Sequence, residues 1–279
     1  MRDSILLTGG TGTTGRRISA ALKSRGALHR VATRSPQTRN DVQFEWADDT
    51  TWTEALDRAS SVYLVAPSGV PDPLRVMEPF LRRAINDGVE RFVLLSASSL
   101  ESGGPMMGSV HAWLSEHAPE WAVLRPTWFM QNFCGQQHLA SIRDESAIYT
   151  ATEEGRIGFI DAEDIAAVAV EFLTRTENES GDVILTGPQA LSYDDVAHEL
   201  TTALGRRVQH CRLSETELAS RHMSSGLPRD YAETLSAMDT SIAAGSENRI
   251  TDSVESITGR PARTLAAFIV ENVAAWRTD

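Results

Sequence analysis

The amino-acid sequence predicts an α/β protein in which a doubly wound parallel sheet is followed by a smaller C-terminal α/β substrate lobe. Short apolar runs alternate with helical patterns up to Pro126, a glycine-rich segment joins the first run to the first helix, and the alternation changes after Pro126. Apolar strands separated by helices are typical of a parallel sheet that is covered on both faces. Right-handed crossovers then place helices on both of those faces.

The first half of the chain supplies the expected sheet. Residues 4–8 (SILLT) have no polar face and fit a buried strand, whereas residues 73–88 have a helical pattern that Gly88 closes. The expected strands are 4–8, 29–34, 42–47, 61–67, 91–98 and 121–126. The expected helices are 15–26, 50–59, 73–88 and 106–118.

After Pro126 an aromatic segment, a strand with a helix, a further strand and several helices are expected. In order they cover 127–133, 155–174, 182–187, 192–206 and parts of 214–279. Acidic residues open the helix within 155–174, where the helix dipole favours them. We expect a nucleotide-binding domain over 1–130, with 155–187 returning to its sheet, and a smaller substrate-binding lobe over 131–154 and 188–279.

Composition narrows the classes of function. The formal net charge of −12 argues against nucleic acid and against anionic membrane surfaces as partners. No run approaches the roughly 18 apolar residues of a membrane span, and the N-terminus has no signal-peptide pattern. Cys134 and Cys211 lie far apart and match no metal-binding spacing, which fits reduced thiols in a cytoplasmic protein. We expect no metal, and a monomer or a homodimer.

The segment LLTGGTGTTG, residues 6–15, is the strongest motif. Gly10, Gly12 and Gly15 form a GxGxxG spacing, and Gly9 with the last two forms GxxGxxG. Such glycines permit a tight turn and a close approach of pyrophosphate to a helix N-terminus. Because this motif lies between a predicted strand and a predicted helix, we interpret it as a dinucleotide-binding loop of a Rossmann domain rather than as a simple turn.

The end of the second expected strand indicates which dinucleotide is bound. NAD-binding domains usually have Asp or Glu there to hold the ribose hydroxyls. This chain has Arg34 and Ser35 instead, with Arg16 and Arg39 nearby in the sequence. A guanidinium group binds a 2′-phosphate through charge-assisted hydrogen bonds, so the sequence predicts NADP(H). The alternative is that Arg34 is an ordinary solvated arginine.

The general pattern resembles the short-chain dehydrogenase/reductase superfamily, which usually works through a Tyr-x-x-x-Lys pair. Lys23 is the only lysine in this chain, and none of the four tyrosines has a lysine four residues after it. The usual proton relay is therefore absent from the sequence. A nucleotide-sugar epimerase of the extended branch is disfavoured for the same reason.

A narrower resemblance covers nearly the whole chain. The segments LLTGGTGTTG, LLSASS, GPMMGSVHAWLSE, WAVLRPTWFMQNF and GRIGFIDAEDIAAVAVEFL resemble the NmrA-like, atypical branch of that superfamily. Within it, the third and fourth segments are most similar to the clavine reductases of ergot-alkaloid biosynthesis and their bacterial relatives. The resemblance implies NADP(H) and a small C-terminal lobe over the nicotinamide. The same branch includes quinone, azo-dye and triphenylmethane reductases and redox-sensing regulators without known turnover.

Carried over by position, the resemblance implies a set of cofactor-binding residues in the loop and at strand ends. They are Gly9, Thr11, Gly12, Thr13, Thr14, Gly15, Arg34, Ala66, Pro67, Ser96, Pro126 and Thr127. Met107 stands where many relatives have a lysine, which again leaves the pocket without an ammonium group. An iminium carbon accepts hydride and becomes a neutral amine, so it needs no proton donor, whereas a simple ketone does. We therefore expect reduction of an iminium or a similarly activated C=N or C=C bond, with a quinone or azo reductase or a non-catalytic NADP(H) sensor as alternatives.

Apolar and aromatic side chains are expected to line a pocket for a small apolar or aromatic substrate. They are Met107, Trp113, Trp128, Phe129, Met130 and Phe133. Aromatic faces stabilise a cation by ~0.5–2 kcal/mol, which would suit an iminium. The alternative is core packing, which is favoured for Trp113. His111 is the titratable group near GPMMGSV that could donate a proton at neutral pH, although a lone helical histidine is more often structural.

Overall fold

The computed structural model describes residues 4–135, 137–176 and 180–277, which form two compact units. Unit 1 is made of the described residues within Met1–Pro126, Ala162–Leu185 and Ser253–Arg260. Unit 2 is made of those within Thr127–Asp161, Thr186–Asp252 and Pro261–Asp279. The chain therefore crosses between the units several times, and each unit has a core of its own.

Unit 1 is built on a parallel sheet of seven strands in the order β3-β2-β1-β4-β5-β6-β8. The strands are β1 (Ser4–Leu7), β2 (His29–Thr33), β3 (Asp41–Gln43), β4 (Ala59–Leu64), β5 (Arg91–Leu95), β6 (Glu120–Pro126) and β8 (Gly181–Leu185). The order reverses between β1 and β4, and ligands of such sheets bind outside the carboxyl ends of the strands at that point. The predicted doubly wound sheet is confirmed.

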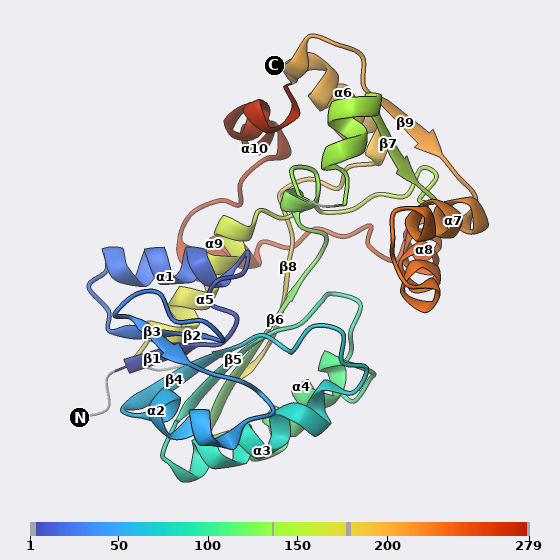
Figure 1. Cartoon of the computed structure of the whole chain (residues 1–279). Coiled ribbons are helices and arrows are strands. Elements are labelled where there is room, and N and C mark those ends of the chain that lie inside the picture. Colours follow the sequence, from blue (N-terminus) through green and yellow to red (C-terminus); the bar gives the residue numbers. More distant parts are fainter. Residues whose placement is uncertain (1–3, 136, 177–179, 278–279) are drawn as a thin grey trace. The chain divides into compact units, whose positions relative to one another are not determined.

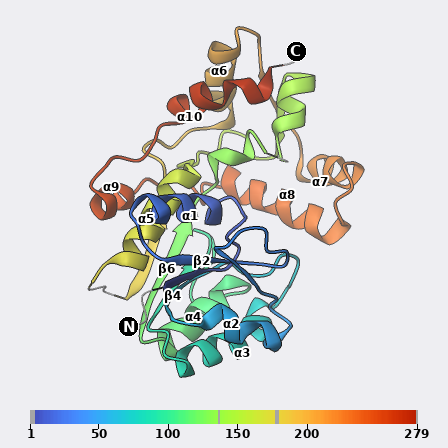
Figure 2. The ribbon, with the colours of Figure 1, turned by 60° about the vertical axis from the view of Figure 1, so that its left-hand side comes forward.

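Helices cover both faces of this sheet (Figures 1 and 2). On one face lie α1 (Gly15–Ser24) and α5 (Ala162–Thr174), which pack against each other, and α9 (Ser253–Thr258), which packs on α5. The other face carries α2 (Trp52–Leu56), α3 (Pro73–Asn86) and α4 (Met107–His117). The core on that side is aromatic, with Phe80 in edge-to-face contact with Phe44 and Trp52.

Unit 2 contains a small sheet of two parallel strands, β7 (Ala147–Thr150) and β9 (Gln209–Arg212). Its helices are α6 (Tyr193–Leu204), α7 (Glu215–Ser224), α8 (Arg229–Ala243) and α10 (Leu265–Asn272). Single turns at Met130–Asn132 and Val273–Trp276 and a π-helical turn at Ser141–Glu145 complete it. Trp276 is fully buried, and its Nε1 donates a hydrogen bond of 2.7 Å to the carbonyl of Phe133, which ties the last turn to the aromatic segment.

The structure differs from the sequence-based expectations in several elements and boundaries. Strand β3 ends at Gln43 rather than at residue 47, and β7 and β9 were not predicted. The strand expected before α5 is absent, because the described residues 155–161 form only isolated bridges, at Ile157 and Ile160. The units also follow other boundaries than the expected domains, since 127–130 and 155–161 belong to unit 2 and α9 belongs to unit 1.

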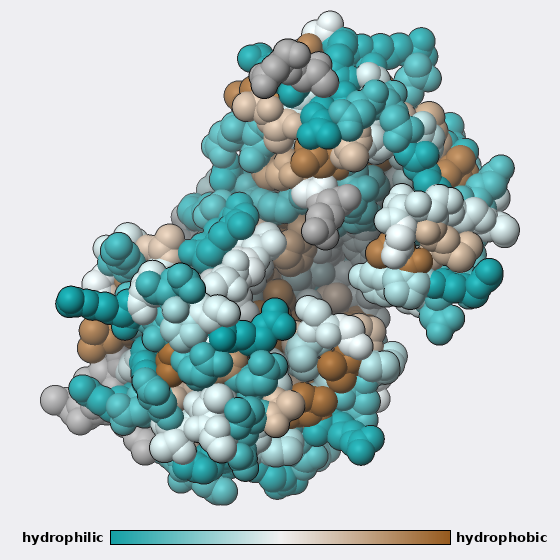
Figure 3. Space-filling view, in the orientation of Figure 1, coloured by the Kyte–Doolittle hydropathy of each residue, from teal (hydrophilic) through white to brown (hydrophobic). Residues whose placement is uncertain are grey.

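Apolar surface is scattered on the face of the molecule that Figure 3 shows, as small patches among hydrophilic side chains. Large hydrophobic residues that are exposed come from distant parts of the chain; they are Leu28, Met106, Tyr231, Ile250 and Val270. Among the described residues, no helix combines the length and the apolar character that a membrane crossing requires.

Candidate nucleotide-binding site

The glycine loop between β1 and α1 has the geometry that a dinucleotide-binding loop needs. Gly9 has φ +63°, and the amide of Gly12 donates a hydrogen bond of 2.9 Å to the carbonyl of Gly9. A Cβ on Gly15 would lie 2.3 Å from that carbonyl oxygen, and one on Gly10 would lie 2.6 Å from a methyl group of Val31. Any side chain at these positions would push the loop away from the sheet, so the glycines are required by close packing.

Buried hydroxyl groups hold the underside of the loop. Thr8 Oγ1 donates to the carbonyl of Tyr63 at 2.9 Å and accepts from the amide of Val65 at 2.9 Å. The hydroxyl of Tyr63 donates to Thr14 Oγ1 at 3.0 Å, and burial raises the pKa of this phenol well above its usual value. Sequence reasoning missed Thr8 and Tyr63, because only the pairing of β1 with β4 brings them together.

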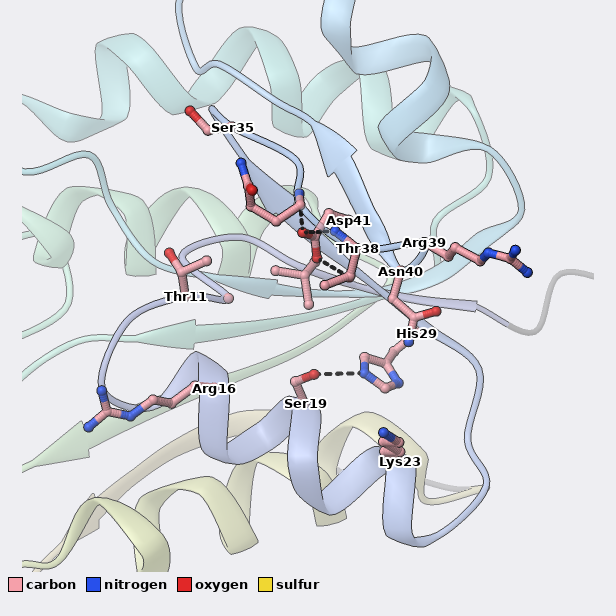
Figure 4. A pocket seen from close by; sticks show the side chains of 13 residues that line it. Thr11, Arg16, Ser19, Lys23, His29, Ser35, Thr38, Arg39, Asn40 and Asp41 are labelled. Atoms are coloured by element: carbon pink, nitrogen blue, oxygen red, sulfur yellow. Dashed lines mark hydrogen bonds between the residues drawn. The ribbon is translucent and has the colours of Figure 1, made fainter.

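A pocket of about 680 Å³ opens beside the loop, between α1 and the segment that follows β2 (Figure 4). It is lined by Gly10, Thr11, Arg16, Ser19, Lys23, His29, Val31, Ser35, Gln37, Thr38, Arg39, Asn40 and Asp41. Arg16, Lys23 and Arg39 contribute three positive charges against the single carboxylate of Asp41. In a chain with a net charge of −12, this pocket is a local concentration of positive charge.

The carboxylate of Asp41 is engaged within its own loop. It accepts hydrogen bonds from the amides of Gln37 at 2.7 Å and Thr38 at 2.9 Å and from Thr38 Oγ1 at 2.8 Å. These bonds lower the pKa of Asp41, and they fold residues 37–41 into a compact turn along the pocket. The Asp41 carboxylate therefore organises the wall of the pocket.

The structure separates the predicted cofactor residues into groups. Thr11 lines the pocket with Ser35, whereas Arg34 is exposed after β2 and is not among the lining residues. Gly9, Gly12 and Thr13 are exposed on the loop, Ala66 and Pro67 follow β4 and are half-buried, and Pro126 ends β6. Thr127 belongs to unit 2, where its hydroxyl donates to the carbonyl of Gly158 at 2.5 Å.

The segment after β5 is held by a buried arginine. The guanidinium group of Arg125 on β6 donates to Asp182 at 2.7 Å, to the carbonyl of Ser98 at 2.9 Å and to Glu101 at 2.5 Å. The amide of Ser98 donates to the carbonyl of Pro126 at 2.9 Å. This segment begins with Ser96, which is 7% exposed and whose Oγ has no hydrogen-bond partner among the described residues. A buried hydroxyl without a partner at the end of a central strand fits a ligand contact.

His111 is buried, and its role as a proton donor stays a prediction. Its ring is 4% exposed, packs 5.4 Å from the ring of Trp121, and has an Nδ1 without a partner among the described residues. Burial lowers the pKa of His111, which favours the neutral form of the ring. The side chain is part of the packing between α4 and β6.

Most of the side chains proposed as pocket walls are buried in or packed on the two cores, and their role in a pocket stays a prediction. Trp113 is buried in the core of unit 1 and stacks on His117 at 4.5 Å. Met130 and Phe133 are each 1% exposed in the core of unit 2. Met107 packs on the edge of the first core. These side chains are buried because α4 packs its apolar face on the core of unit 1, and the aromatic segment 127–133 packs on the core of unit 2. Trp128 and Phe129 are half-buried, and their role in a pocket stays a prediction.

Comparisons with known proteins point to one family. No protein-family model matches the chain. The chain is 43% identical to the uncharacterized oxidoreductase YesF of Bacillus subtilis, over 99% of this chain and 97% of that protein. It is 39% identical to the agroclavine dehydrogenase of Claviceps fusiformis, over 98% of each chain. It is 30% identical to an NAD(P)H azoreductase of Xenophilus azovorans, over 98% of this chain and 99% of that one.

Among solved structures, an NADPH-dependent quinone oxidoreductase of Escherichia coli in complex with NADPH has the same fold. Its TM-score is 0.83 at 22% identity, over 96% of this chain and 99% of that chain. The relatives and the shared fold confirm the resemblance that the sequence motifs indicated. The chain belongs to the NmrA-like atypical short-chain dehydrogenases/reductases, a family of NADP(H)-dependent oxidoreductases, in the branch similar to the agroclavine and festuclavine dehydrogenases.

Proposed function

We propose that this protein is an NADP(H)-dependent reductase that transfers hydride to an iminium or a similarly activated C=N or C=C bond of a small apolar molecule. The observation that carries the cofactor assignment is the basic pocket beside the glycine loop. The sequence similarity to agroclavine dehydrogenase supports the choice of substrate class. When bound, the reduced nicotinamide supplies two electrons and a proton as a hydride equivalent.

The glycine loop fits the pyrophosphate of the cofactor, and the end of the pocket at Thr11 and Arg16 fits its 2′-phosphate. The loop would hold the pyrophosphate against the N-terminus of α1. Thr11, Arg16 and Ser35 would hold the 2′-phosphate of the adenosine, with Arg34 next to Ser35 in the chain. The ribose-binding acid of an NAD site is missing at the end of β2, and an arginine near a phosphate dianion forms charge-assisted hydrogen bonds.

The proposed reaction needs no acid from the protein. Hydride adds to the carbon of C=N⁺, the π electrons move to nitrogen, and the product is a neutral amine together with oxidised cofactor. The chain has one lysine, and Lys23 lies on α1 with no tyrosine four residues before it. Tyr63 is buried and bonds to Thr14, so its phenol serves the loop rather than a substrate. The protein would act by binding and positioning the acceptor.

A quinone or azo compound is the second candidate acceptor. The NAD(P)H azoreductase is 30% identical over nearly the whole chain, and this similarity favours such an acceptor over a carbonyl compound. A quinone accepts hydride into a delocalised anion that water protonates, so this reaction also needs no Tyr-Lys pair.

Cofactor binding is tested by calorimetric titration of NADPH and NADH. We expect NADPH to bind more tightly than NADH, and Arg16→Ala to weaken NADPH by about tenfold to a hundredfold while leaving NADH unchanged, because one charge-assisted contact is lost. The Arg34→Ala variant measures whether the guanidinium of Arg34 also binds NADPH. Arg75 is an exposed arginine on α3, and Arg75→Ala is the matched control. If neither NADPH nor NADH binds, the proposed reductase is rejected.

The acceptor is tested by following NADPH oxidation with a preformed dihydroisoquinolinium ion, a naphthoquinone and an azo dye. We expect the iminium ion to be reduced fastest, because its reduction needs no proton from the protein. Turnover of the quinone or the dye without the iminium would support the second candidate. NADPH binding without turnover of any acceptor would favour a sensor.

A further inference from the structure

We propose that Arg17 is a positioning residue of the dinucleotide loop, which fixes the direction of the Thr14 amide so that this amide faces the pyrophosphate of NADP(H). The proposal rests on the proposed function in one respect, the assignment of the glycine loop to the pyrophosphate. Arg17 is in the first turn of α1, two residues after the last glycine of the loop, and it does not line the pocket beside the loop.

The guanidinium group of Arg17 joins the loop to a neighbouring helix. Its Nη1 donates a hydrogen bond of 2.8 Å to the carbonyl of Thr13, and its Nε donates one of 2.8 Å to Oε1 of Glu163 in the first turn of α5. Both helices belong to unit 1 and lie side by side (Figures 1 and 2). The Arg17 side chain is only 18% exposed. Because Glu163 holds the guanidinium group in place, that group in turn holds the loop carbonyl in one direction.

The carbonyl of Thr13 has no other partner among the residues that the structure describes. In a regular α-helix it would accept from the amide of residue 17, but that amide donates to the carbonyl of Thr14 instead, at 3.0 Å. The side chain of Arg17 therefore takes the place of the missing backbone donor. A loop carbonyl without a donor is free to rotate, and a carbonyl oxygen that turns toward a phosphate repels it.

The geometry of the peptide transfers this constraint to the next amide. A peptide unit is planar and trans, so the carbonyl of Thr13 and the amide of Thr14 point in opposite directions. The amides of Thr13 and Thr14 donate to no group within the described part of the chain, and amides of this kind before a helix bind phosphate. The hydroxyl of Tyr63 holds the Thr14 side chain at 3.0 Å. The peptide between the two threonines is therefore fixed on both sides.

The alternative is a bridge that only joins the two helices, and Arg25 provides an example of one. Arg25 lies just after α1, and its Nη2 donates to Glu171 of α5 at 2.6 Å. The two bridges are eight residues apart on both helices, which is about 12 Å along the axis. Among the described residues, the Arg25 side chain bonds to Glu171 alone. The bond to the loop carbonyl is therefore what distinguishes Arg17 from Arg25.

The proposal is tested by calorimetric titration of Arg17→Met and Arg25→Met with NADPH and with NADH, after denaturant unfolding has shown that both variants are folded. We expect Arg17→Met to bind both nucleotides about tenfold more weakly, because both have the pyrophosphate that the Thr14 amide faces. Arg25→Met should bind both as the wild type does. The equal effect on the two nucleotides separates Arg17 from Arg16, whose loss should weaken NADPH alone. Equal affinity of the two methionine variants for NADPH would overturn the proposal.

Two variants of Glu163 separate the position of the guanidinium group from its charge. If Arg17 acted only through its charge, Glu163→Ala would strengthen nucleotide binding, because a nearby negative charge is removed. We expect Glu163→Ala to weaken both nucleotides by about threefold, because the guanidinium group loses its second anchor. Glu163→Gln should bind at least as tightly as the wild type, because its side-chain carbonyl still accepts from Nε. Stronger binding by Glu163→Ala would contradict the positioning role. If the wild type binds neither nucleotide, the proposed function itself fails, and the role of Arg17 fails with it.

Discussion

Gly15 shows how one residue joins the fold to the site. It is the first residue of α1 and the last glycine of the loop, and the space for its Cβ is already taken by the backbone of Gly9 and Gly10, at 2.3 and 2.5 Å. Backbone atoms cannot rotate away as a flexible side chain can. The position therefore accepts only glycine while the loop keeps its present path over the sheet.

We expect Gly15→Ala to abolish measurable NADPH binding, because the loop must move away from the helix N-terminus that faces the phosphates. Gly26→Ala is the matched control. Gly26 lies after the other end of α1 and has φ +69°, but its Cβ would meet nothing within 4 Å. That variant should lose about 1 kcal/mol of stability and keep its affinity for NADPH. Calorimetric titration and denaturant unfolding of both proteins give the comparison, and unchanged affinity in Gly15→Ala would contradict the loop assignment.

Among the elements, β6 is notable because its carboxyl end organises the segment that follows β5. Arg125 bridges Asp182 on β8 with the carbonyl of Ser98 and with Glu101, and its side chain is almost wholly buried. These bonds link β6, β8 and the segment that leads to α4. Ser96 begins that segment, and its amide donates a hydrogen bond of 2.8 Å to the carbonyl of Leu124 on β6, so the segment is anchored on β6 near Arg125.

We expect Arg125→Met to reduce the free energy of unfolding by about 2–4 kcal/mol, because the buried carbonyl of Ser98 loses its charged donor. Arg91→Met is the matched control at the other end of the sheet, since Arg91 bridges Glu120 and the carbonyls of Leu173 and Arg175 in a similar way. Both variants should be destabilised in denaturant unfolding. The KM for NADPH should rise only in Arg125→Met, and an equal rise in both would show a purely structural role.

At the scale of the whole molecule, unit 2 buries several titratable groups. Burial lowers the pKa of His138 to about 3 and also lowers the pKa of His210 and His222. Burial raises the pKa of Asp239 to about 6, and its carboxyl accepts a hydrogen bond of 3.0 Å from the amide of Ala151. The folded chain therefore favours neutral histidines and a protonated Asp239.

We expect the free energy of unfolding to fall as the pH drops below about 6.5, the ordinary pKa of a histidine side chain in water. As the pH falls, each histidine binds its proton in the unfolded chain before it does so in the folded chain. Each such histidine lowers the free energy of unfolding by about 1.4 kcal/mol per pH unit below its unfolded pKa. Asp239 has the opposite effect between about pH 4 and 6, because the folded chain binds its proton first. The three histidines of unit 2 and His111 of unit 1 together outweigh one carboxyl, so the free energy of unfolding measured with denaturant should be about 1–3 kcal/mol lower at pH 5.5 than at pH 7.5.

Two variants check the signs of these contributions. From pH 7.5 to pH 5.5, the free energy of unfolding of His138→Leu should fall by about 1 kcal/mol less than that of the wild type. The unfolded variant has one histidine fewer to take up a proton. In Asp239→Asn the free energy of unfolding should fall by about 1 kcal/mol more than in the wild type, because the carboxyl that partly offsets the histidines is gone. The amide oxygen of the asparagine still accepts the hydrogen bond from the amide of Ala151. If the wild type, His138→Leu and Asp239→Asn all had the same pH dependence of stability, groups other than His138 and Asp239 would cause it.

The parallel sheet, the glycine loop and the absence of a Tyr-Lys pair could all be predicted from the sequence. These features are local: strands of the sheet are apolar runs a few residues long, the loop is one contiguous motif, and a missing lysine can be read directly. Apolar periodicity also places His111 and Trp113 on a helix, but it reports burial without saying which neighbours cover the side chain. The sequence therefore favoured core packing for Trp113 and left His111 as a candidate proton donor, and the structure shows that both side chains are buried.

The grouping of charged side chains could not be predicted in the same way. The sequence pattern favoured Arg34 because it follows β2 directly, whereas the pocket is lined by Arg16, Lys23 and Arg39, which come from α1 and from a turn held by Asp41. The pairing of β7 with β9 joins segments about 60 residues apart, and neither has a pattern that marks it as a strand of a shared sheet. Contacts between distant segments depend on how whole elements pack, and no local pattern of residue types encodes that packing.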